Sequence, residues 1–110
     1  KQHGFGVVRD LVGHGLGKDL HESPEVPNYG KRGRGVQLKD GLVIAIEPMI
    51  NLGNKAVKKA PDGTIQSKDN MPSAHYEHTI AVRTDGPDIL SNHEWVEEEI
   101  KKNSEIRQIQ

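Results

Sequence analysis

The chain has 110 residues, of which 33% are hydrophobic and 4% aromatic, so it forms no more than one small domain with a thin core. Fifteen basic residues against sixteen acidic ones give a net charge of −1, which argues against a broad surface for nucleic acid. The absence of cysteine excludes disulfides and thiolate metal sites and favours a cytoplasmic location, and no apolar run approaches the roughly 20 residues of a membrane-spanning helix.

The N-terminal part of the sequence predicts a strand followed by a glycine-rich loop. Its first residues, KQHGFG, contain no initiator methionine and no signal-peptide pattern, so we expect the chain to belong to a longer polypeptide. Residues 6–12 predict a strand that leads into GHGLGKDLHESPEVPNYG. The glycines and prolines of that stretch exclude a helix, so its histidines are expected on a loop.

The central part predicts a strand that carries one carboxylate. After the basic segment KRGRG and a turn at residues 39–41, LVIAIEPMI at residues 42–50 predicts a strand buried on both faces. Pro48 forces Glu47 into extended geometry and ends the hydrogen-bond ladder, so Glu47 is expected at a strand terminus. Because an unpaired carboxylate is costly to desolvate, Glu47 is interpreted as a site residue, and the alternative is a salt bridge to lysine or arginine.

A hairpin and a second strand with a carboxylate are predicted next. Residues 54–70 have polar flanks around Pro61-Asp62-Gly63, which is typical of a hairpin or loop. Residues 75–82 alternate as a strand does, and Glu77 lies on the face with small side chains. Glu77 is therefore a second candidate site residue, although a strand with one solvent-exposed face explains it equally well.

The C-terminal part predicts a turn and a helix. A turn at residues 85–87 precedes Ser91-Asn92-His93-Glu94, which fits a capping box at the start of a helix over 92–110. The predicted organisation is a main unit at residues 1–91 and a helical extension at residues 92–110.

His14, Glu47 and Glu77 together form a candidate metal site. One histidine and two carboxylates make a hard, oxygen-rich set of ligands that suits Mn, Co, Fe or Zn ions. His14 lies between two glycines, which leave its imidazole free to approach an ion, whereas a lone loop histidine is more often simply solvated. His21-Glu22 does not complete the helical H-E-x-x-H zinc motif, because Glu25 occupies the place of the second histidine.

The chain resembles the C-terminal half of type I methionine aminopeptidases in three segments. In chain order these segments are GHGLGKDLHE (13–22), AIEPMI (45–50) and AHYEHT (74–79). The resemblance covers about residues 5–90. It implies an α/β chain that forms the C-terminal half of a pita-bread fold, with a mostly antiparallel curved sheet and a flanking helix.

The resemblance also implies a function and a set of residue roles. The function is metal-dependent hydrolysis that removes the initiator methionine from peptides and nascent proteins. His14, Glu47 and Glu77 would be ligands of two divalent metal ions (Co, Mn, Fe or Zn), with Glu77 bridging them. His21 would contact the scissile carbonyl as a catalytic and substrate-binding residue, and Glu47 would also move a proton.

Two departures from the family pattern limit what the 110 residues do alone. The remaining two ligands of the family are aspartates in an N-terminal half, which no residue before His14 supplies, so the isolated chain is expected to be inactive. Leu20 and Thr64 stand where relatives often carry aromatic residues near the methionine pocket, so the side chains expected to contact methionine differ from those of the family.

Two other functions stay open at the level of the sequence. A relative without metals would be a binding module that holds protein or RNA in the cleft or at KRGRG, and a truncated product would be inactive. The enzyme is favoured because a module freed from catalysis has no physical reason to keep two desolvated carboxylates beside a histidine. If this interpretation is right, the donor atoms of His14, Glu47 and Glu77 converge on one cleft.

Overall fold

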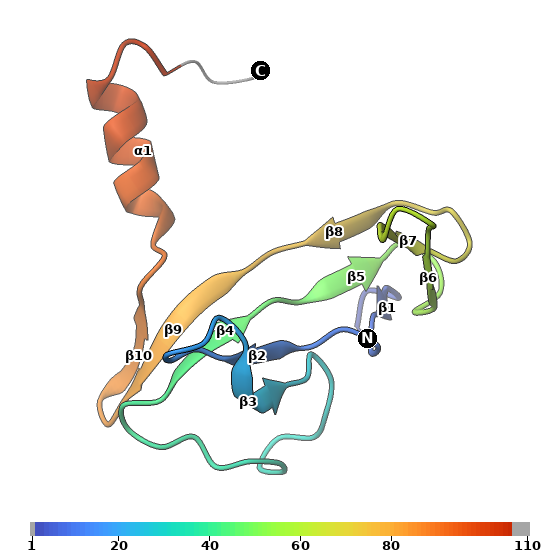
Figure 1. Ribbon diagram of the computed structural model, residues 1–110, viewed down its shortest axis with the longest axis horizontal. Helices are drawn as coiled ribbons and strands as arrows, with labels where there is room; N and C mark the ends of the chain where they lie inside the picture. The colour runs from blue at the N-terminus through green and yellow to red at the C-terminus, as the bar shows by residue number, and fades with distance from the viewer. Residues whose placement is uncertain (1, 107–110) are drawn as a thin grey trace.

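The computed structural model describes residues 2–106, which form three antiparallel sheets and one helix (Figure 1). A five-stranded sheet has the order β10-β9-β4-β2-β3, a three-stranded sheet has the order β1-β5-β8, and β6 and β7 form a hairpin. The strands are β1 (Gly6–Val7), β2 (Gly13–Gly15), β3 (Glu22–Val26), β4 (Val43–Ile46), β5 (Met49–Asn51), β6 (Val57–Lys59), β7 (Ile65–Ser67), β8 (Ser73–His75), β9 (His78–Arg83) and β10 (Gly86–Ile89). The helix α1 (His93–Lys102) projects away from the sheets.

The two larger sheets are joined by a pair of long, interrupted strands. β4 continues into β5 across Glu47-Pro48, and β8 continues into β9 across Tyr76-Glu77 (Figure 1). Ile46 pairs with His78 on one side of the interruption and Met49 pairs with His75 on the other. Because both ladders keep the same register, Glu47 lies opposite Glu77. The Tyr76 amide donates to the Pro48 carbonyl at 3.2 Å, which confirms this alignment.

Several predicted elements differ from the observed ones. The strand predicted at residues 6–12 is strand only at Gly6–Val7, and the expected continuous strands at 42–50 and 75–82 are each interrupted. The prediction that 42–50 is buried on both faces was wrong at Ile46, which is 37% exposed. The turn before β10 begins one residue earlier than predicted, at Thr84-Asp85, because Gly86 and Pro87 belong to β10. The hairpin around Pro61-Asp62-Gly63 is confirmed as β6–β7.

The glycine-rich segment expected to be a loop contains the strands β2 and β3. β2 lies between β3 and β4, and its glycines let neighbouring backbones approach closely. A Cβ at Gly13 would overlap the Ala45 carbonyl, and one at Gly15 would overlap the Ser23 carbonyl. The glycine-rich composition predicts a loop, but β2 is stabilised as a strand by its pairing with β3 and β4.

Replacing Gly13 by alanine is therefore expected to destabilise the protein. The new methyl group would force β2 away from β4, at a cost typical of overpacking, about 1–3 kcal/mol. Urea unfolding of the intact protein measures the free energy of unfolding. An unchanged value would contradict the close approach of β2 to β4.

The buried core is small, as the composition predicts. Among the described residues, the buried hydrophobic side chains are Val8, Ile44, Ala45 and Ala81. Asn51 is also buried, at 1% exposure, and its amide bonds the Asn54 carbonyl at 2.7 Å while its carbonyl oxygen accepts from the Ser73 hydroxyl at 2.8 Å. Asp69 accepts from the amides of Asn54 and Met71, and these hydrogen bonds lower the pKa of its carboxyl. Polar contacts thus hold the hairpin end of the molecule.

The helix begins one residue later than the predicted capping box implies. Asn92, not Ser91, is the N-cap, and its side chain accepts from the Glu94 amide at 3.0 Å. Ser91 is instead bound to β9. The helix ends at Lys102 with Asn103 as C-cap, and residues 107–110 of the predicted helix lie outside the described residues. Within residues 2–106 no helix has the length and apolar character that crossing a membrane requires.

Candidate metal centre

Sheet register places three predicted ligands on one face of the five-stranded sheet. His14 in β2 pairs with Ala45 in β4, and Ala45 pairs with Thr79 in β9. Glu47 lies two residues after Ala45 and Glu77 two residues before Thr79, so both share a face with His14 because side chains alternate along a strand. Ala45, between them in register, carries only a methyl group and is fully buried.

The three side chains converge. One potential ligand atom from each of His14, Glu47 and Glu77 lies within 4.8 Å of the other two. His14 Nε2 is 3.2 Å from Glu47 Oε1, and these side chains are only 15% and 14% exposed, whereas Glu77 is exposed. The structure therefore brings together the residues predicted as ligands, from strand β2 and from the two strand interruptions.

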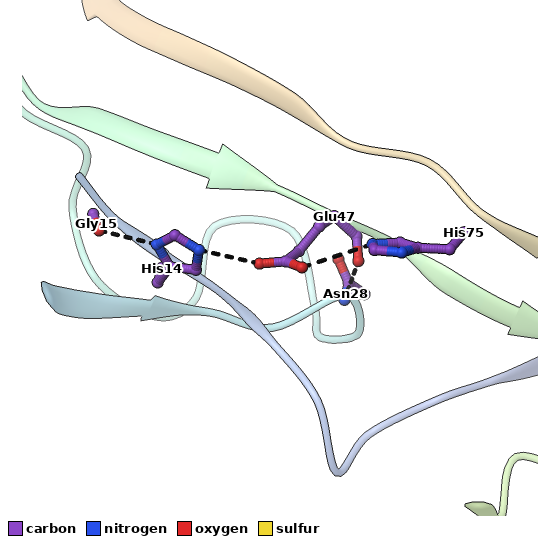
Figure 2. Close-up of polar contacts among 5 residues, drawn as sticks. All are labelled: His14, Gly15, Asn28, Glu47 and His75. Atoms are coloured by element: carbon purple, nitrogen blue, oxygen red, sulfur yellow. Dashed lines mark hydrogen bonds and ion pairs between the residues drawn. The ribbon is translucent and has the colours of Figure 1, made fainter. Parts of the chain in front are cut away.

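The hydrogen bonds of His14 indicate which ring nitrogen is available to a cation. Its Nδ1 lies 3.0 Å from the Gly15 carbonyl, which only accepts, so Nδ1 carries the proton (Figure 2). In the neutral imidazole, Nε2 then presents a lone pair directly toward the Glu47 carboxylate. Two acceptors at 3.2 Å repel unless a positive charge lies between or beside them, either a proton or a metal ion.

The two carboxylates also require a positive charge between or beside them. Residues directly opposite in an antiparallel pair have Cβ atoms about 4.5–5.5 Å apart, and like charges in that position destabilise the sheet. Glu47 and Glu77 occupy such a position at the strand interruption. A divalent cation is the kind of partner that converts this repulsion into attraction, so the donor set suits a metal.

His75 is a site residue that the sequence did not reveal. Its Nε2 lies 3.5 Å from Glu47 Oε2, on the opposite side of the carboxylate from His14 (Figure 2). Asn28 donates its side-chain amide to the Glu47 carbonyl at 3.4 Å. The sequence feature that could have identified His75 is its position two residues before Glu77. Because Glu77 lies opposite Glu47, His75 is a diagonal cross-strand neighbour of Glu47.

His21, the predicted substrate-contacting residue, lies beside His14. The two rings meet edge to face with their centroids 4.2 Å apart, and His21 is exposed. Both histidines line an open depression of about 310 Å³ together with Glu22 and Glu25. His21 is therefore next to the cluster, where it can contact a bound molecule.

A second cavity, mostly apolar, lies on the other side of the cluster. It has a volume of about 320 Å³ and includes His75 in its wall. The hydrophobic side chains that line it are Val8, Leu11, Met49, Val57, Ile65 and Ala74. Leu20 and Thr64 are not among its lining residues, and Leu20 is 72% exposed.

Comparisons with known proteins match most of the chain. The model of the family described as Metallopeptidase family M24 matches residues 1–84. The methionine aminopeptidase of Clostridium perfringens is 54% identical over 90 residues, which are 81% of this chain and 36% of that protein. Methionine aminopeptidase 1 of Bacillus subtilis is 51% identical over 88 residues, which are 79% of this chain and 36% of the relative.

Solved structures show the same relationship. The crystal structure of methionine aminopeptidase from Thermotoga maritima superposes with a TM-score of 0.79 and 47% identity, over 83% of this chain and 37% of that one. The enzyme from Rickettsia prowazekii gives a TM-score of 0.79 with 43% identity, over 83% and 38%. The chain thus spans little more than a third of the proteins it matches, and the predicted partial pita-bread fold is confirmed.

Proposed function

Because the chain belongs to metallopeptidase family M24, we propose that it supplies part of the metal centre of an aminopeptidase that removes N-terminal methionine from peptides and nascent proteins. The observation that carries this proposal is the convergence of His14, Glu47 and Glu77 on one face of the sheet. The similarity to proteins named methionine aminopeptidase supports the reaction and the substrate. We assign residues 1–91 to the peptidase unit and 92–110 to an extension.

We propose that the cluster holds two divalent ions of Co, Mn, Fe or Zn. His14 Nε2 would bind one ion, Glu77 would bridge both, and Glu47 would bind through one oxygen. Three protein ligands are too few for a pair of ions, so in this proposal the others would come from outside these 110 residues, as carboxylates of an N-terminal part of the protein. Such ions polarise a carbonyl and lower the pKa of water.

The protein's own residues orient the reacting groups in this proposal. Glu47 has its two oxygens directed differently, Oε1 toward His14 and Oε2 toward His75. An N–H from His75 would hold Oε2, which leaves Oε1 for the ion and keeps the carboxylate placed to accept a proton. His21, exposed beside His14, would donate a hydrogen bond to the scissile carbonyl of the peptide.

The apolar cavity beside His75 suits the side chain of the residue that is removed. Aliphatic side chains and Met49 form the apolar part of its wall, and it begins one side chain from Glu47. The polar lining residues are Asn51, Gln66, Ser67, Ser73 and His75. Burial of an unbranched thioether side chain there would place the adjacent peptide bond near the cluster. We therefore propose that this cavity selects methionine, in place of the surroundings of Leu20 and Thr64 that the resemblance implied.

Metal dependence of methionine release from Met-Ala-Ser tests the proposal. The intact protein here means these 110 residues together with the N-terminal part proposed above. We expect it, after dialysis against a chelator, to release no methionine and to regain activity with Mn²⁺ or Co²⁺. Metal content measured by mass spectrometry should rise in parallel. Release that is insensitive to the chelator, or no release at any metal concentration, would contradict the proposed function.

A further inference from the structure

The segment between β10 and α1 contacts the residues that follow Glu77. The Ser91 hydroxyl accepts a hydrogen bond from the Thr79 amide at 3.0 Å and lies 2.9 Å from His78 Nδ1. The Leu90 amide donates to the Thr79 carbonyl at 2.9 Å. Beyond Ile80–Ile89, the last pair of β9 and β10, the Leu90–Thr79 backbone bond and the Ser91 side chain continue the contact toward Glu77.

The start of the helix contacts the residue that precedes Glu77. The ring of His93, the first residue of α1, stacks on Tyr76 with centroids 5.4 Å apart and an interplanar angle of 18°. The His78 ring meets Tyr76 edge to face at 5.0 Å. Residues 91–93 thus touch both neighbours of Glu77, and they lie beyond residues 1–84, the part of the chain that the family model matches.

We propose that Ser91 is a positioning residue for Glu77, a role that rests on the proposed function of Glu77 as a metal ligand. Glu77 is exposed and lies in the interruption between β8 and β9, where no ladder pairing restrains it. Metal ligands must be held within about 0.5 Å of their productive geometry. Ser91 restrains the first residues of β9, while the Tyr76–Pro48 hydrogen bond restrains the chain on the other side.

The chemistry of serine explains why this residue type can hold the strand. A hydroxyl has one proton and two lone pairs, so Ser91 accepts from the Thr79 amide and bonds His78 Nδ1 in either tautomer. Alanine would leave the Thr79 amide without this partner, whereas threonine retains the hydroxyl. The pair Ser91→Ala and Ser91→Thr therefore separates the hydrogen bond from the bulk of the side chain.

The experiment combines Mn²⁺ titration calorimetry with amide hydrogen exchange on the intact protein. We expect Ser91→Ala to weaken Mn²⁺ binding by about tenfold, the lower end of the range for residues that orient metal ligands. Exchange protection of the Thr79 amide should fall in the same variant. Ser91→Thr should restore both, and Ser104→Ala, at an exposed serine of the extension at residues 92–110, should match the parent protein.

The outcomes separate the two proposals. Lost Thr79 protection with unchanged Mn²⁺ affinity would overturn the positioning role and leave the metal centre intact. Unchanged Thr79 protection in Ser91→Ala would overturn the hydrogen bond itself. Absence of Mn²⁺ binding by the parent protein would refute the proposed function, and with it the positioning role, whatever the exchange data show.

Discussion

Replacing Glu77 by glutamine will stabilise the metal-free protein slightly and, at the same time, remove its metal binding. Glu77 lies opposite Glu47 across the strand interruption, and like charges in directly opposite positions destabilise a sheet by about 0.2–1 kcal/mol. Glutamine keeps the size and removes the repulsion. An ion held by Glu77, as proposed, would however lose a charged ligand, and its affinity should fall by more than about 100-fold, since even residues that only orient a ligand contribute 10–100-fold.

Two measurements check that the stability of the metal-free protein rises while the metal affinity falls. Urea unfolding in the presence of a chelator gives the stability of the metal-free protein, and calorimetry gives the Mn²⁺ affinity. Glu98→Gln, at an exposed position of α1, removes the same charge away from the cluster and should change neither quantity appreciably. If Glu77→Gln binds Mn²⁺ and releases methionine like the parent protein, the bridging role is wrong.

Replacing His14 is expected to reduce metal affinity, whereas replacing the adjacent His21 is expected to reduce the rate of methionine release. His14→Ala should weaken metal binding by more than about 100-fold, because its Nε2 lone pair faces the cluster. His21→Ala should bind metal nearly as the parent does but release methionine about 10²–10⁴-fold more slowly, the usual loss for one positioned proton-donating group. The two rings are in contact, so each variant serves as the control for the other.

This pair of variants also tests the assignment of roles. Metal affinity and the kcat for Met-Ala-Ser should be measured on the same preparations, with circular dichroism to verify folding. Loss of metal binding in His21→Ala would make that residue a ligand, contrary to the proposal. An active, metal-loaded His14→Ala protein would remove the histidine from the metal centre.

The site could be predicted in part because some constraints are local. Pro48 ends the ladder after Ile46, which is why Glu47 stands at a strand terminus, as expected. The hairpin around Pro61-Asp62-Gly63 follows from its turn residues. The resemblance of three short segments to methionine aminopeptidases, which the comparisons support, implied His14, Glu47 and Glu77 as ligands from the sequence alone. The structure brings these three side chains together.

Tertiary structure alone decided how these pieces meet. The register of β4–β5 against β8–β9 sets Glu47 opposite Glu77 and brings His75 to its far oxygen, and register depends on pairing between segments distant in the chain. For the same reason β2 is a strand despite its glycines, and Ser91 holds β9 instead of capping the helix. Sequence determined which side chains were available, whereas long-range backbone pairing determined which of them became neighbours.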